Sequence, residues 1–113
     1  MCVRSRRFVL DDKPVLIATA YLLASLVAGS AITQEDTGSG GIYARLAELG
    51  SQPVHLREEI RSRMPSADEV EQLNGTPVML ICRTAFADEG RAVEVNEMTL
   101  DSASYILEYA FDA

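Results

Sequence analysis

The chain lacks the residues from which most metal sites and disulfides are built. Among its 113 residues there are two cysteines, Cys2 and Cys82, and one histidine, His55. Two thiols without metal-ligand spacing do not make a zinc site, and nothing in their spacing requires a disulfide. We therefore expect no bound metal, no cofactor and a reduced protein of the cytoplasm.

Recognisable catalytic machinery is also missing from the sequence. No serine or cysteine stands in a nucleophile setting, and acid–base chemistry would have to rely on the single histidine. The chain is therefore not expected to be an enzyme, and no residue is assigned a catalytic role.

Positive charge is scarce. Ten Lys and Arg residues are set against 17 Asp and Glu residues, which gives a net charge of −7. Nonspecific binding to nucleic acid or to an anionic membrane requires clustered positive charge. The chain by itself is therefore not expected to hold DNA.

One long hydrophobic run, residues 15–32, carries no charge over eighteen positions. Its length allows a short transmembrane helix or a signal peptide, which leaves a membrane or exported small protein as one alternative. Against this, Asp11 and Asp12 lie just before the run, where a signal peptide would be basic. The run also divides into a β-branched, aromatic part and a small-residue part, which favours a strand followed by a helical turn.

What remains is the composition of one globular domain, with 48% hydrophobic and 24% charged residues. Apolar patterns predict extended segments over residues 2–10, 15–22, 54–64, 79–87, 92–100 and 105–111. Helices are expected over residues 23–27, 42–49 and 66–75, the last opened by a capping box of Ser66 and Glu69, with a loop over 28–41. This order predicts an α+β fold, an antiparallel sheet of about five to six strands with helices on one face.

The predicted hairpin within residues 75–100 recurs weakly near the N-terminus. A shift of 77 positions places Arg6 on Arg83 and Asp11 on Asp88. The sequence therefore predicts a duplicated hairpin. The N-terminal copy is apolar on much of both faces, which predicts that it lies in the centre of its sheet.

The segment 54–64 alternates between apolar and charged side chains. Its charged face carries His55, Arg57, Glu59, Arg61 and Arg63. We interpret this face as a solvated sheet surface, with a subunit interface or a pocket wall as the alternatives.

The chain resembles a known family in three ordered segments, which read GGIYARLAELGSQPV, REEIRSRMPSADEVEQL and GTPVMLICRTAFADEGRAVEVNEMTL. With the arginine strand before Pro14, they are similar to the effector-binding (UTRA) domain of bacterial transcription regulators of the GntR superfamily, HutC subfamily. The resemblance covers essentially the whole chain. It implies the chorismate-lyase-like fold of two related halves, which would account for the duplicated hairpin.

The resemblance also implies a role. Family members bind a small metabolite in this domain, and binding changes how an N-terminal winged helix-turn-helix engages operator DNA, commonly as a homodimer. The resemblance implies that residues 3–113 are this domain, incomplete at its N-terminus, and we expect the DNA-binding domain to be absent from this sequence. We therefore expect an effector-sensing domain for transcription regulation. The alternative is a stand-alone ligand-binding or dimerisation protein with no DNA role.

The resemblance places Arg6 where family members that sense sugar phosphates have an arginine. A guanidinium group suits phosphate or carboxylate oxygens. A second family arginine falls on Phe8, a family glutamate on Ala18 and a helix-start serine on Gly41. These departures argue against a sugar phosphate and favour a carboxylate-bearing or mostly apolar metabolite.

Four further side chains are candidates for the effector site. Arg83 is the repeat partner of Arg6, and Tyr105 matches a family tyrosine near the pocket. Glu94 and Glu97 lie on opposite faces of one predicted strand, so at most one can face a pocket. The candidates for effector binding are thus Arg6, Arg83, Tyr105, Glu94 and Tyr43, each with plain packing or solvent exposure as its alternative.

The scarcity of positive charge predicts that the purified chain does not retard operator DNA. In an electrophoretic mobility assay at physiological salt, DNA from the region upstream of its own gene should migrate unchanged. A retarded band that survives excess nonspecific competitor DNA would contradict this prediction.

Overall fold

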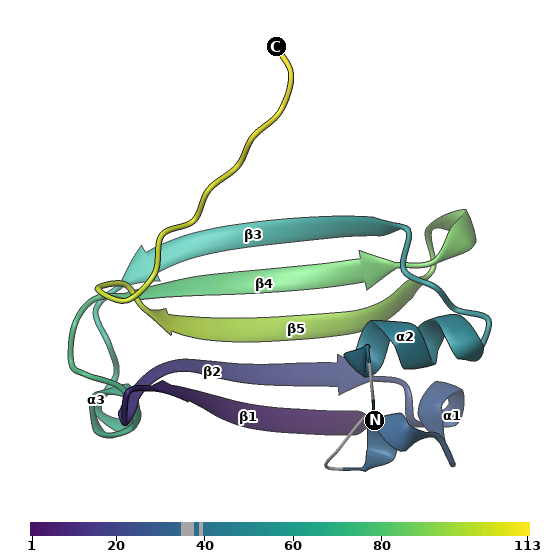
Figure 1. Cartoon of the computed structure of the whole chain (residues 1–113), viewed down its shortest axis with the longest axis horizontal. Helices are drawn as coiled ribbons and strands as arrows, with labels where there is room; N and C mark the ends of the chain where they lie inside the picture. Colours follow the sequence, from purple (N-terminus) through teal and green to yellow (C-terminus); the bar gives the residue numbers. More distant parts are fainter. Residues whose placement is uncertain (35–37, 39) are drawn as a thin grey trace.

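The computed structural model describes residues 1–34, 38 and 40–113, which form one antiparallel sheet with short helices at its ends (Figure 1). The strands are β1 (Cys2–Leu10), β2 (Lys13–Leu22), β3 (His55–Arg63), β4 (Val78–Phe86) and β5 (Ala92–Asp101). Their order across the five-stranded sheet is β1-β2-β5-β4-β3. The predicted antiparallel α+β fold is confirmed.

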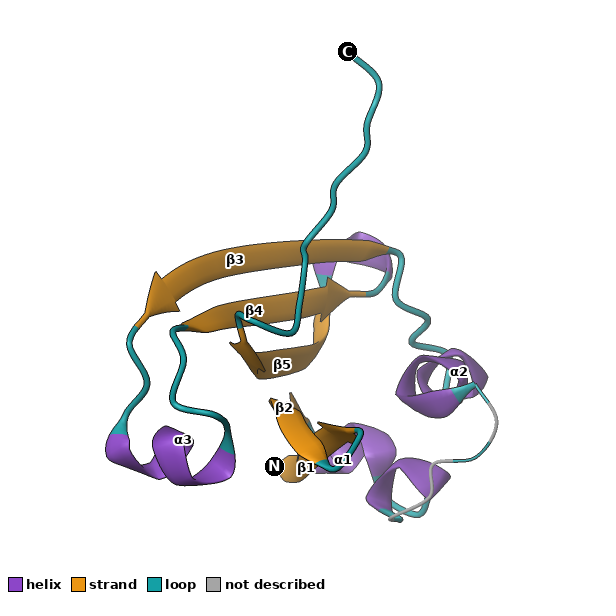
Figure 2. Ribbon diagram, turned by 60° about the vertical axis from the view of Figure 1, so that its left-hand side comes forward, coloured by secondary structure: helices purple, strands orange, loops and turns teal. Residues whose placement is uncertain are grey.

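The helical segments gather at the two ends of the sheet (Figure 2). They are α1 (Ala24–Val27), the 3-10 turn η1 (Ala31–Thr33), α2 (Gly41–Glu48), α3 (Ala67–Gln72) and the 3-10 turn η2 (Asp88–Gly90). The expectation that helices cover one face holds for α1, η1 and α2. By contrast, α3 connects β3 to β4 at the far end, and the predicted capping box of Ser66 and Glu69 opens it.

The two related hairpins, β1–β2 and β4–β5, meet where β2 pairs with β5. This pairing, which we call the β2–β5 seam, runs from Leu16 opposite Leu100 to Tyr21 opposite Val95. Side chains alternate between faces along a strand, so the register places Arg6 and Arg83 on the same face of the sheet.

The core lies between this face and the helices at one end. Leu22, Val27, Ile32 and Leu46 are each at most 1% exposed and belong to one cluster. Burying such a side chain contributes roughly 1.5–3 kcal/mol, which is enough to fix α1, η1 and α2 against the sheet. The uncharged run 15–32 covers most of β2, all of α1 and most of η1. Among the described residues no helix is long and apolar enough to cross a membrane.

The prediction that the N-terminal hairpin is central in the sheet is only half right. β2 is an inner strand, but β1 pairs with β2 alone among the described residues and forms an edge. Val3, Val9 and Leu10 on β1 are 54%, 52% and 62% exposed. An apolar pattern on both faces reports the hydrophobicity of a strand, but it does not report whether another strand lies beside it.

The predicted last strand, residues 105–111, is wrong. This segment has no strand assignment, and the chain after β5 crosses the sheet near β4 and β3 and then extends away (Figure 1). Ile106 and Phe111 are 90% and 88% exposed. Alternating aromatic and apolar residues are typical of strands, but within the described chain no neighbouring strand offers the hydrogen bonds. The predicted 28–41 loop contains η1 and in part lies outside the described residues.

A buried carboxylate holds the end of the sheet near α3 together. Asp101 is completely buried, and its oxygens accept hydrogen bonds from Thr76 Oγ1, from Ser104 Oγ at 2.8 Å and from the Ala103 amide at 3.2 Å. Asn74 Nδ2 donates to Asp101 at 3.0 Å and to the Pro14 carbonyl at 2.7 Å. The Asp101 side chain therefore connects the loop before β4 to the chain after β5, and Asn74 extends this network to the start of β2.

Burial alone would raise the pKa of Asp101, but its hydrogen bonds outweigh this effect and lower the pKa to about 2. Because the pKa is lower in the folded than in the unfolded chain, the carboxylate stabilises the fold above about pH 4. This contribution, roughly 2 kcal/mol, is lost as the pH falls from about 4 towards 2.

We expect Asp101→Asn to lower the free energy of unfolding at pH 7 by roughly 2 kcal/mol, because an amide cannot accept this set of hydrogen bonds. Urea unfolding followed by circular dichroism should also show a shallower loss of stability between pH 4 and pH 2. Asp112→Asn in the exposed tail is the matched control. Equal pH dependence in Asp101→Asn and the wild type would contradict the assignment.

Candidate functional site

A cavity of about 350 Å³ opens on the face of the sheet that carries α2, and we call it the seam cavity. Both hairpins and the start of α2 line it, so it lies across the β2–β5 seam. Its volume is within the range of small-molecule sites. The lining residues are Arg4, Arg6, Phe8, Ala18, Ala20, Gly40, Gly41, Ile42, Tyr43, Arg83, Glu94 and Asn96.

The start of α2 forms one wall of the seam cavity. Gly40 is the N-cap with a positive φ of 87°, and no side chain caps the helix. A Cβ added at Gly40 would lie 2.7 Å from the Ala44 Cβ, so glycine is required by space as well as by φ. The first amides of a helix have no partner within the helix and favour an anion. This wall is therefore electropositive.

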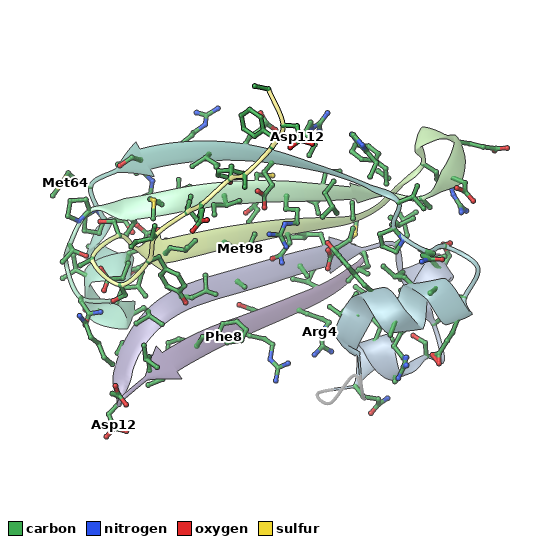
Figure 3. The ribbon with its side chains drawn as sticks, turned by 45° about the horizontal axis from the view of Figure 1, so that its top comes forward. Arg4, Phe8, Asp12, Met64, Met98 and Asp112 are labelled. Atoms are coloured by element: carbon green, nitrogen blue, oxygen red, sulfur yellow. The ribbon has the colours of Figure 1, made fainter. Side chains whose placement is uncertain are left out.

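Arg4 and Arg6, both on β1, differ in the interactions of their guanidinium groups. Arg4 lies beside α2, with Phe8 further along the same strand (Figure 3). Arg4 Nη1 donates to the Ile32 carbonyl at 2.7 Å and to the Gln34 carbonyl, so its guanidinium fixes η1 against β1. Arg6 is exposed, and no carboxylate in the described part of the chain forms an ion pair with it. Arg6 can therefore meet an incoming anion.

Arg83 lies on β4 and is held by Glu58 on β3. Nε and Nη2 of Arg83 each lie 2.7 Å from Glu58 Oε2, and Glu58 Oε1 accepts a hydrogen bond of 3.0 Å from the Tyr109 hydroxyl. Burial would lower the pKa of Arg83, but the hydrogen bonds and charge of Glu58 raise it overall. The guanidinium is therefore a fixed cation with further N–H groups to offer, and it also connects to the C-terminal tail.

Two buried oxygen atoms on β5 face the cavity without a hydrogen bond from the described residues. Glu94 is 4% exposed, and burial raises its pKa against the opposing effects of Tyr43 and Arg83. Within residues 1–34, 38 and 40–113, no hydrogen-bond donor reaches Glu94 Oε1 or Asn96 Oδ1, although both atoms are buried. Buried polar atoms are rarely left in this state unless a ligand or water completes them.

Tyr43 lies at the first turn of α2, near Arg83 and Glu94. Burial and the negative charge of Glu94 raise the pKa of Tyr43, and Arg83 lowers it. Its hydroxyl therefore stays protonated at neutral pH and can donate or accept a hydrogen bond at the cavity wall.

The structure brings four of the five predicted site residues to the seam cavity. Arg6, Arg83, Glu94 and Tyr43 line it. Tyr105 is not among the lining residues and lies, partly buried, at the start of the tail. Phe8, Ala18 and Gly41, where the resemblance implied lost polar contacts, also line the cavity. The roles of these residues in binding stay predictions.

Sequence reasoning missed three polar residues at the site, Glu58, Asn96 and Tyr109. One of them had a visible signal, because Glu58 lies between Leu56 and Ile60 in the same row of β3 and is the one acid in that row. The pairing of Glu58 with Arg83 follows from the register of β3 and β4. Asn96 and Tyr109 gave no signal, because single polar residues in strands and tails are common.

The sequence model of the UTRA domain matches residues 1–106. The HTH-type transcriptional regulator Rv0792c of Mycobacterium tuberculosis is 30% identical over 105 residues, which cover 84% of this chain and 37% of that protein. The chain thus spans little more than a third of this curated relative.

Solved structures share the fold. PhnF from Mycobacterium smegmatis superposes with a TM-score of 0.83 at 20% identity, over 96% of this chain and 49% of that one. The ligand-binding domain of a GntR-family transcriptional regulator from Bordetella bronchiseptica gives 0.79 at 18% identity, over 96% of this chain and 71% of that one. At such identities the likeness establishes the fold alone.

We expect Glu58→Gln to loosen the tail, because the Tyr109 hydrogen bond to a carboxylate is replaced by one to a neutral amide. Chymotrypsin should therefore cleave after Tyr109 several-fold faster than in the wild type, as followed by mass spectrometry. Glu59→Gln, on the other face of β3, is the matched control. Cleavage at the wild-type rate in Glu58→Gln would show that Glu58 does not hold the tail.

Proposed function

Because this chain belongs to the UTRA domain family, we propose that it is the effector-binding part of a transcription regulator and takes a small anionic metabolite into the seam cavity. The observation that carries this proposal is the convergence of Arg6 and Arg83, one from each hairpin, on the cavity that the start of α2 also lines. Guanidinium groups and helix N-termini are the groups that proteins use to bind carboxylates and phosphates.

The rest of the wall narrows the choice of anion. Phe8, Ala18 and Ala20 give it an apolar stretch beside Arg6. Arg83 already shares one carboxylate, Glu58, so only part of its charge is available to a ligand. A doubly charged phosphate would need more cation than this, whereas a carboxylate with a partly apolar body matches both features.

A ligand in the seam cavity would contact both hairpins at once. Its binding energy would therefore favour one geometry of the β2–β5 seam, which is the element that a regulator could couple to DNA binding. Operator DNA would be contacted by a separate domain of the whole regulator. We further propose that the regulator works in the cytoplasm as a homodimer, without catalysing a reaction. The exposed apolar edge of β1 supports contact with a second copy, since such edges pair readily.

Thermal unfolding of the purified chain with single compounds tests this proposal. We expect 3-phenylpropanoate or hexanoate to raise the melting temperature and glucose 6-phosphate to raise it less, because the cavity offers little free positive charge for a phosphate. A ligand at a hundred times its Kd stabilises the folded chain by roughly 2.7 kcal/mol. The shift should disappear in Arg83→Ala and fall in Arg6→Ala. Arg61→Ala, on the opposite face, is the control. Equal shifts in Arg83→Ala and the wild type would contradict binding in this cavity.

A further inference from the structure

The seam cavity has two chemically different sides. Arg6 and the start of α2 present positive charge and N–H donors, whereas Glu94 and Asn96 on β5 present acceptor oxygens. A simple carboxylate would satisfy the first side and leave the second side unpaired.

The unpaired acceptors lie close enough to serve one group. Glu94 and Asn96 are separated by one residue on the same strand, which places their Cα atoms roughly 6.5 Å apart on one face. Tyr43 and Arg83 adjoin Glu94, as their effects on its pKa show. An ammonium group has three donors and no acceptor, so it can donate to both oxygens.

No cation among the described residues forms an ion pair with Glu94. Arg83 forms its ion pair with Glu58, and Arg4 donates to the main-chain carbonyls of η1 and of Gln34. A buried carboxylate without a hydrogen-bonded cation is costly, so a ligand that brings positive charge gains more there than a neutral hydroxyl would. Burial raises the pKa of Glu94, and the hydrogen bond with Tyr43 and the charge of Arg83 offset this effect only in part.

We propose that the effector is a small zwitterion, whose cationic N–H group is bound by Glu94 and Asn96 and whose carboxylate is bound by a guanidinium on the facing wall. This inference rests on the proposed function and deepens it, because it names the charge pattern of the metabolite. Strand alternation places Glu94 at the cavity, whereas Glu97, three positions on, faces the other side of the sheet.

Pairs of compounds that differ by one amine test the proposal by isothermal titration calorimetry at pH 7. The pairs are leucine and 4-methylpentanoate, phenylalanine and 3-phenylpropanoate, 4-aminobutanoate and butanoate, and 6-aminohexanoate and hexanoate. In at least one pair the amino acid should bind ten or more times more tightly than its deaminated partner. For a leucine preference, 3-methylbutylamine, which lacks the carboxylate, should also bind at least tenfold more weakly.

Variants of Glu94 and Asn96 test whether these residues cause the preference for the amino acid. Glu94→Gln keeps the shape of the side chain and removes its charge, so the amino acid should fall to the affinity of its deaminated partner, whose own Kd should stay unchanged. Glu97→Gln, on the other face of β5, should keep the preference. Asn96→Leu, which removes the second acceptor, replaces Glu94→Gln if that variant does not fold by circular dichroism.

The outcomes separate this inference from the proposed function. If the deaminated acids bind as tightly as the amino acids and lose affinity in Arg6→Ala or Arg83→Ala, the zwitterion is wrong and the anion site stands. If no compound binds, 3-phenylpropanoate and hexanoate included, the anion site of the proposed function fails together with the zwitterion. An amine preference that survives both Glu94→Gln and Asn96→Leu would also overturn the assignment.

Discussion

The arrangement of the whole chain depends on the hydrogen bonds that converge on the Asp101 carboxylate. Its hydrogen-bond partners come from two segments, the loop before β4 (Asn74 and Thr76) and the turn after β5 (Ser104), and Asn74 also donates to the Pro14 carbonyl at the start of β2. A buried charge is tolerated only when it is fully hydrogen-bonded, so these segments cannot move apart independently. This end of the sheet is rigid, and the seam cavity lies toward its other end, beside α2.

The seam cavity combines residues that are far apart in sequence and close in the sheet. Arg6 and Arg83 occupy equivalent places in two related hairpins, and the register of β2 with β5 puts them on one face. The two arginines differ in their partners. Arg83 forms an ion pair with Glu58, whereas Arg6 has no such ion pair among the described residues. The cavity therefore has one restrained cation and one available cation, each from a different hairpin.

Much of this could be predicted from the sequence, for reasons that differ between elements. The hairpins and the capping box of α3 depend on neighbouring residues, and local patterns report them well. The edge position of β1 and the unpaired tail depend on what lies beside a strand, which no local pattern contains. For the site, resemblance and strand alternation indicated Arg6, Arg83, Glu94 and Tyr43. Glu58 and Asn96 gain their importance only from cross-strand register and burial.

The β2–β5 seam also determines the order in which the native state can be completed. Each hairpin closes over a turn of a few residues, but the seam joins Leu16 to Leu100 and must close a loop of more than eighty residues. Pairings between distant segments form slowly, since chain entropy is lost before they are made. The two hairpins are therefore expected to form first and the seam last. The binding cavity exists only after that final step, so a metabolite held there would act on the slowest and most cooperative part of folding.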